Sequence, residues 1–118
     1  MRQAFFAPAH AGSLSRDYPL VLSASVKEAA QGAEVLLEAG IAEGIITEMR
    51  YRVRGCPYLI AAAEALCKER EQGAVAALSS FALAELMEML AIPVEKSGRI
   101  LLLEDALKSL WAQYSDAA

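Results

Sequence analysis

The sequence lacks the residue sets from which most catalytic sites are built. Its 118 residues include one histidine and two cysteines, and they offer no glycine-rich phosphate loop, no Ser-His-Asp set and no pair of catalytic carboxylates. A stand-alone hydrolase or transferase needs at least one of these arrangements. We therefore do not expect this protein to be an enzyme.

Long apolar runs are also missing, although the chain is rich in apolar residues. Hydrophobic residues make up 56% of the sequence and the mean hydropathy is +0.32, yet no uninterrupted apolar run approaches the roughly 20 residues that cross a bilayer. The apolar stretch in the first dozen residues is too short for a secretory signal. The sequence predicts a cytoplasmic protein without membrane contact, whose apolar surplus lines a core or a protein interface.

A surplus of basic residues is absent as well. The net charge is −4 and the isoelectric point is about 5.0, which gives no support to nucleic-acid binding. The one local group of cations consists of Arg50, Arg52 and Arg54, which alternate along a predicted strand and share one face. We interpret this group as a solvated face, with a partner surface as the alternative.

The chain length is that of a single domain. Residues 1–18 carry proline and glycine with little periodicity, which predicts an arm or loop over a domain that spans residues 19–118. His10 lies in this arm, and we expect it to be an ordinary surface residue and not a metal ligand.

Alternation of apolar and polar residues predicts strands, and a spacing of three to four predicts helices. Three strands are predicted over residues 20–26, 33–39 and 45–54, with the last two joined by a turn over residues 40–44. Helices are predicted over residues 57–72, 75–78 and 81–90, the third capped by Ser80, and a last helix begins at Ser97 or Gly98. Strands followed by separate helices indicate an α+β domain with a small antiparallel sheet.

The pair Gly55-Cys56 stands where the third predicted strand runs into the first helix. Backbone N–H groups and the helix dipole at such a position favour an anion, whether a thiolate, a sulfur species or a metal-bound sulfur. Cys67 lies eleven residues further on, within the apolar stripe of the same helix, where we expect a buried thiol. A separation of roughly 16 Å along the helix excludes a disulfide between the two.

Several short motifs follow one another along the chain: Phe5 with Pro8 and Gly12, Gly44-Ile45-Ile46, Gly55-Cys56 with Ile60-Ala61, Ile92-Pro93 with Lys96, and Leu102 with Glu104-Asp105-Ala106. Their order and nearly their spacing are those of the IscU/NifU N-terminal family of iron–sulfur cluster assembly scaffolds, which the chain resembles over nearly its whole length. Phe5, Pro8 and Gly12 are similar to that family's HFxNPRNxG stretch.

The resemblance implies three antiparallel strands with helices packed on one side. It also implies a role in cluster assembly, because family members use three cysteines and an aspartate to hold zinc, iron or a nascent [2Fe–2S] cluster. Only the middle cysteine has a counterpart here, Cys56, which is the one residue we assign to cluster or metal binding. The third cysteine falls on Arg99 and its preceding histidine on Gly98, while the first cysteine and the aspartate belong near residues 30–34, where one register offers Glu34.

Structural zinc and [2Fe–2S] clusters each take four protein ligands. One cysteine per chain cannot supply four ligands, so three hypotheses stay open. The protein is a scaffold that handles cluster or sulfur with a partner such as a cysteine desulfurase, or it is a thiol carrier of persulfide sulfur. The third hypothesis is a metal-free interaction or regulatory module. Arg99 is expected near Cys56.

Residues 92–96 align with the Leu-Pro-Pro-Val-Lys segment that family members present to an Hsp70-type chaperone. Val94 and Glu95 depart from that segment, so we do not expect chaperone binding.

Overall fold

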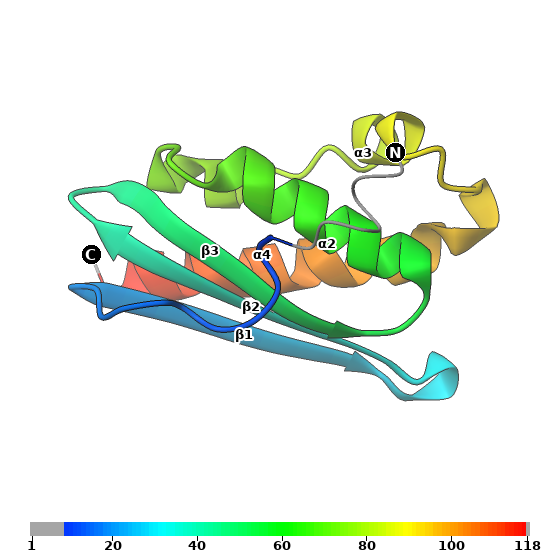
Figure 1. Cartoon of the computed structure of the whole chain (residues 1–118), viewed down its shortest axis with the longest axis horizontal. Helices are drawn as coiled ribbons and strands as arrows, with labels where there is room; N and C mark the ends of the chain where they lie inside the picture. The colour runs from blue at the N-terminus through cyan, green and yellow to red at the C-terminus, as the bar shows by residue number, and fades with distance from the viewer. Residues whose placement is uncertain (1–8, 118) are drawn as a thin grey trace.

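The computed structural model describes residues 9–117 and shows one antiparallel sheet with helices on one of its faces (Figure 1). The sheet has the order β1-β2-β3, formed by Leu20–Glu28, Ala33–Ala42 and Ile45–Arg54. The helices are α2 (Pro57–Arg70), α3 (Leu83–Met89) and α4 (Ser97–Ala117), with short 3-10 turns η1 (Ala29–Gln31), η2 (Val75–Ser79) and η3 (Val94–Lys96). The predicted α+β class is confirmed. Phe5 and Pro8 lie outside the described residues.

The strands form where apolar side chains alternate, because every second residue then faces the helices. On β2 the buried apolar residues are Ala33, Val35, Leu37, Ala39 and Ile41, and the middle three are fully shielded from solvent. The register of β2 on β3 shifts between Gly40 and Ile41, where a bulge lets the pairing continue to Ala42. The predicted turn over residues 40–44 is therefore wrong in length: the turn is Glu43-Gly44, whose positive φ angles of 54° and 75° suit a two-residue hairpin.

Two helices cover the inner face of the sheet, with α2 over β3 and α4 over β1 and β2. The buried side of α4 is an apolar stripe at helical spacing that includes Ile100, Leu103, Leu107 and Leu110. This helix begins at Ser97, as predicted. Within the described part of the chain, no helix has the length and apolar character needed to cross a bilayer.

The predicted capping role of Ser80 is wrong. The residue before α3 is Ala82, and Ser80 instead ends η2 with extended backbone angles. The carbonyl oxygen of Ser80 accepts a hydrogen bond of 2.8 Å from the guanidinium of Arg70, at the end of α2. This contact holds Ser80 in an extended conformation, and Ala82 is also non-helical, so α3 begins two residues later than its apolar pattern suggests.

Other parts of the chain contact both edges of the sheet and cover part of each. On the β1 edge, the Gln113 side chain of α4 donates to the Ser23 carbonyl at 2.7 Å and accepts from its N–H. On the β3 edge, Ile46 exchanges backbone hydrogen bonds with Gln72 and Gly73, and Tyr51 does so with His10 and Gly12. Because open edges invite pairing with other chains, these contacts protect the sheet, and they fix the N-terminal arm beside α2.

Candidate functional site

Cys56 lies in the turn that joins β3 to α2. Gly55 before it approaches the sheet closely, since a Cβ there would lie 3.0 Å from Leu59 Cδ2 and 3.7 Å from the Cβ of Ala33 on β2. Cys56 itself is the N-cap residue of α2, and its carbonyl accepts from the N–H groups of Leu59 and Ile60. Its thiol caps no backbone group and is half-buried. The sequence thus located this thiol correctly at a strand-to-helix turn.

The second thiol, Cys67, is fully buried in the core, as predicted. Burial raises its pKa far above the ordinary thiol value, and the nearby carboxylates of Glu64 and Glu71 raise it further. Both cysteines are free. Cys56 is therefore the thiol that can react or bind a ligand without unfolding of the domain.

A network of polar side chains joins the N-terminal arm to α2 and β3. Both ring nitrogens of His10 contact carboxylates: Nδ1 lies 2.5 Å from Glu64 on α2, and Nε2 lies 3.1 Å from Glu71, the residue that follows α2. Glu64 also accepts from the backbone N–H of His10 and from the hydroxyl of Tyr51. The His10 side chain is only 13% exposed. The expectation that His10 is an ordinary surface residue is therefore wrong.

The network continues along β3 through Arg50. Its guanidinium pairs with Glu71 at 2.6 Å and with Glu48 at 3.0 Å. Burial raises the pKa of Glu71, but hydrogen bonds from the Met49 N–H, Arg50 and His10 outweigh it, so the net pKa lies below its usual range. Arg52 and Arg54 are exposed as predicted, whereas Arg50 departs from the predicted solvated face.

Glu48 is the buried end of this network, with 3% of its surface exposed. It accepts from the backbone and hydroxyl of Ser15 and, at 2.6 Å, from the hydroxyl of Tyr18. Burial raises its pKa, but these hydrogen bonds and the charge of Arg50 lower it more, so the net pKa lies below its ordinary value. The carboxylate ties the arm to the outer face of the sheet.

Comparison with known proteins shows which family has this sequence and fold. The family model described as the NifU-like N-terminal domain matches residues 1–118. The chain belongs to this family. A crystal structure of a NifU-like N-terminal protein from Brucella abortus is similar at a TM-score of 0.72 with 15% identity, over 100% of this chain and 95% of that one.

A second crystal structure supports the same fold. It is of a protein from Fervidobacterium islandicum AW-1, described as an iron–sulfur cluster assembly scaffold for the SUF system, with a TM-score of 0.70 and 12% identity over 93% of this chain and 92% of that one. A search of curated proteins found no match. The NifU-like N-terminal family consists of iron–sulfur cluster assembly scaffolds, so the resemblance seen in the motifs is confirmed at the level of family and fold.

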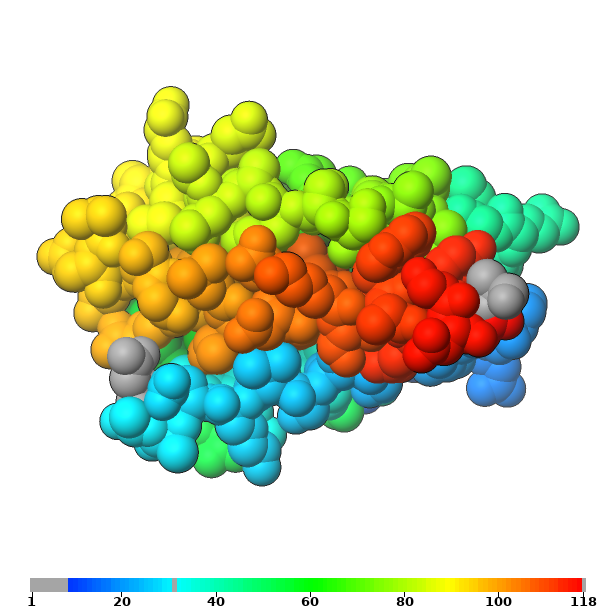
Figure 2. All heavy atoms as spheres, turned by 180° about the vertical axis from the view of Figure 1, so that it is seen from behind, coloured from blue at the N-terminus to red at the C-terminus, as the bar shows by residue number. Residues whose placement is uncertain are grey.

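The segments that carry the three cysteine positions of the NifU-like family lie at one end of the molecule. Figure 1 shows the turn between β1 and β2, the start of α2 and the start of α4 at the same end, and Figure 2 shows the first and last of these at one end from behind. In the register of the motif resemblance, the family's cysteines are expected near residues 30–34, at Cys56 and at Arg99. The fold brings these three segments to one end of the molecule.

The residues present at that end do not fit a cluster held by this chain alone. Glu34, the one acidic residue that the family register offers, pairs with Arg54 at 3.1 Å and with Lys27 at 3.7 Å. Among residues 9–117, no group of three or more histidine, cysteine, aspartate or glutamate side chains is arranged to hold a metal ion. Of the two free cysteines, only Cys56 lies at this end with its thiol half-buried, whereas Cys67 is sealed in the core.

The His10 network was missed at the level of sequence because its members are far apart, with 54 residues between His10 and Glu64 and 61 between His10 and Glu71. One signal was available. Glu64 and Glu71 are seven residues apart, so both lie on one face of the helix predicted over residues 57–72, the face that also carries Cys67. A carboxylate on a buried face needs a partner, and His10 is the only histidine in the chain.

Proposed function

We propose that this protein is a NifU-like scaffold that takes part in iron–sulfur cluster assembly only with a partner, and that Cys56 is its ligand or sulfur-accepting residue. The chain keeps the fold of the family and the half-buried thiol at the start of α2. It lacks the other two cysteines. The partner, for which a cysteine desulfurase is the first candidate, would supply the missing ligands.

A single observation carries this proposal, namely that one thiol is left at the end of the molecule where the family places three. Four ligands are needed for zinc or for a [2Fe–2S] cluster, and the second cysteine is sealed in the core. Even two copies of the chain together would bring only two copies of Cys56. Ligands from outside the chain are therefore required for cluster binding.

Restoring the missing ligands tests the proposal. The variant Arg99→Cys with Gly98→His should bind zinc, whereas the unchanged chain should carry far less than one equivalent. The position tolerates the change, since a Cβ at Gly98 meets no atom within 4 Å. Zinc is measured by elemental analysis after dialysis against a weak chelator.

Two further variants serve as controls for this test. Adding Cys56→Ala to the double variant should abolish zinc capture, whereas adding Cys67→Ala should leave it intact because Cys67 is buried in the core. Capture that survives the loss of Cys56, or no capture by the double variant, would contradict the assignment of Cys56 and the family register around Arg99.

A second candidate function is transfer of persulfide sulfur, which is supported by Cys56 being the one accessible thiol. The Cys56 thiolate would attack the outer sulfur of a persulfide on the desulfurase, so that a new S–S bond forms at Cys56 and the desulfurase cysteine leaves as a thiolate. Incubation with a desulfurase and cysteine would then add the mass of one sulfur atom to Cys56. Peptide mapping that finds no sulfur on Cys56 would exclude this candidate.

A further inference from the structure

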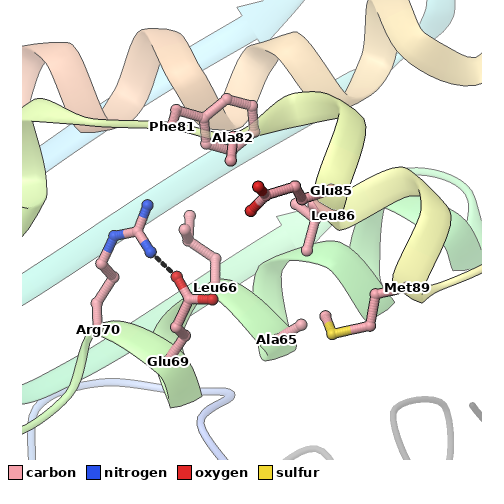
Figure 3. Close-up of a pocket in the computed structure, with 9 residues that line it drawn as sticks. All are labelled: Ala65, Leu66, Glu69, Arg70, Phe81, Ala82, Glu85, Leu86 and Met89. Atoms are coloured by element: carbon pink, nitrogen blue, oxygen red, sulfur yellow. Dashed lines mark hydrogen bonds and ion pairs between the residues drawn. The ribbon is translucent and has the colours of Figure 1, made fainter.

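A groove between α2 and α3 lies outside the Cys56 site. Its volume is about 150 Å³. Six of its nine lining residues are apolar, namely Ala65 and Leu66 from α2, Phe81 and Ala82 from the segment before α3, and Leu86 and Met89 from α3; the other three, Glu69, Arg70 and Glu85, are charged. Figure 3 shows these side chains around the open space, with Met89 at the rim.

The mouth of the groove carries two carboxylates. Glu85 is exposed, and its carboxylate points into the groove in Figure 3. Glu69 is 68% exposed on its side chain and pairs with Arg70. Arg70 is 8% exposed, and its guanidinium also donates to the carbonyls of Ala77 and Ser80, so its hydrogen bonds are directed into the protein. Glu85 has no ion pair within the described residues.

The α3 side of the groove is acidic. α3 carries Glu85 and Glu88, both exposed, and no basic residue, and the residues that follow it as far as Glu95 add no cation. A local excess of one sign attracts a partner of the opposite sign and rejects one of the same sign. A docking partner for this face is therefore basic.

The size of the groove indicates what enters it. A cavity of about 150 Å³ holds a group the size of benzene, whereas sites for small-molecule ligands are usually about 300–1,000 Å³. Met89 beside it is 61% exposed, and exposed methionines are typical of surfaces that adapt to protein partners. The groove is thus suited to one apolar side chain of a protein and not to a cofactor.

We propose that the groove between α2 and α3 docks a basic amphipathic segment of a partner protein, which places an apolar side chain between Phe81 and Met89 and a lysine or arginine beside Glu85. This surface is separate from Cys56 and needs no metal. The binding test below therefore does not depend on whether the protein takes part in cluster assembly.

A designed peptide tests the proposal directly. The probe is a fluorescein-labelled helix of about 14 residues, roughly four turns, with leucines on one face and lysines beside them; a second peptide replaces every lysine by glutamate. We expect the basic peptide to bind with a Kd below about 1 mM and to bind more weakly as the salt concentration is raised. We expect the acidic peptide not to bind. Amide resonances of isotope-labelled protein should shift at Ala65, Glu69, Phe81, Glu85 and Met89.

Matched variants assign the binding to the groove. Glu85→Gln should weaken the basic peptide about threefold, the size expected of one exposed ion pair, while Asp116→Asn at the end of α4 should not. Met89→Ser should weaken it about fivefold or more because an apolar contact is lost, while Val21→Ser, another exposed apolar residue on β1, should not.

Four results would overturn the proposal. They are equal affinity for the two peptides, no binding of the basic peptide, resonance shifts on another face, and binding that is unchanged in the Glu85 and Met89 variants. Sedimentation of the unliganded protein could give a fifth such result. A dimer that Met89→Ser dissociates would show that a second copy of the chain, and not a basic partner, occupies the groove.

Discussion

Replacing Gly40 by alanine should destabilise the protein through a residue that is distant in sequence. Gly40 lies on β2 under the ring of Tyr18, and a Cβ at this position would come within 2.6 Å of the Tyr18 Cγ atom and closer to two other ring atoms. The ring must move, and with it the hydroxyl that donates to buried Glu48 at 2.6 Å. The change therefore removes a donor from a carboxylate that is 3% exposed.

The expected cost follows from this lost bond. A hydrogen bond to a charged group contributes about 1.5–3 kcal/mol, and a Gly→Ala change returns about 0.4–1 kcal/mol by restricting the unfolded chain. The net loss is about 1.5 kcal/mol. With an unfolding entropy of about 0.25 kcal/mol/K for a chain of this length, the melting temperature should fall by about 6 °C.

The assay is urea and thermal unfolding of four proteins: the unchanged chain, Gly40→Ala, Tyr18→Ala and the double variant. In the Tyr18→Ala background the clash is gone, so Gly40→Ala should stabilise the fold by about 0.4–1 kcal/mol. Gly98→Ala is a control, because a Cβ there meets no atom within 4 Å, and it should also stabilise. An equal loss from Gly40→Ala with and without Tyr18 would refute the reasoning.

Three other outcomes follow from the structure. Iodoacetamide should label Cys56 well before Cys67, because Cys67 is buried and its pKa is raised by burial and by Glu64; peptide mapping that finds Cys67 labelled first would contradict both placements. The folded state holds the pKa of Glu48 and of Glu71 below the ordinary 4.5, so it binds fewer protons than the unfolded state, and the free energy of unfolding should fall as pH drops below about 4.5. Glu71→Gln should make the free energy of unfolding depend less steeply on pH below about 4.5. An unchanged dependence would show that the lowered pKa of Glu71 is not its cause. His10→Ala should speed hydrogen exchange at the Gly12 and Tyr51 amides, which bond across the arm and β3, while amides paired between β1 and β2 keep their rates; equal exchange at all sites would show that His10 does not hold the arm.

Local patterns predicted much of the fold because they report local geometry. The alternation before Gly55 located β3 at residues 45–54, and the start of α4 at Ser97 also agreed. The bulge at Gly40 and the late start of α3 were missed, because the first depends on pairing with β3 and the second on a hydrogen bond from Arg70. These causes lie in tertiary contacts that no short window contains.

The residues of the candidate site also differ in whether local sequence could predict them. Cys56 could be placed from a single glycine-cysteine pair between a strand and a helix. His10 could not, because its burial depends on two carboxylates that are distant along the chain. The groove between α2 and α3 also escaped prediction, since it exists only where two helices and the segment before α3 meet.

The central claim is that this NifU-like chain handles iron and sulfur only together with a partner. The most direct measurement is the amount of iron, zinc and acid-labile sulfide per chain after anaerobic purification, with and without a cysteine desulfurase, cysteine and ferrous iron. We expect far less than one equivalent on the chain alone, and iron with sulfide in a complex with the desulfurase that Cys56→Ala loses. Stoichiometric, tightly held metal on the chain alone would contradict the claim.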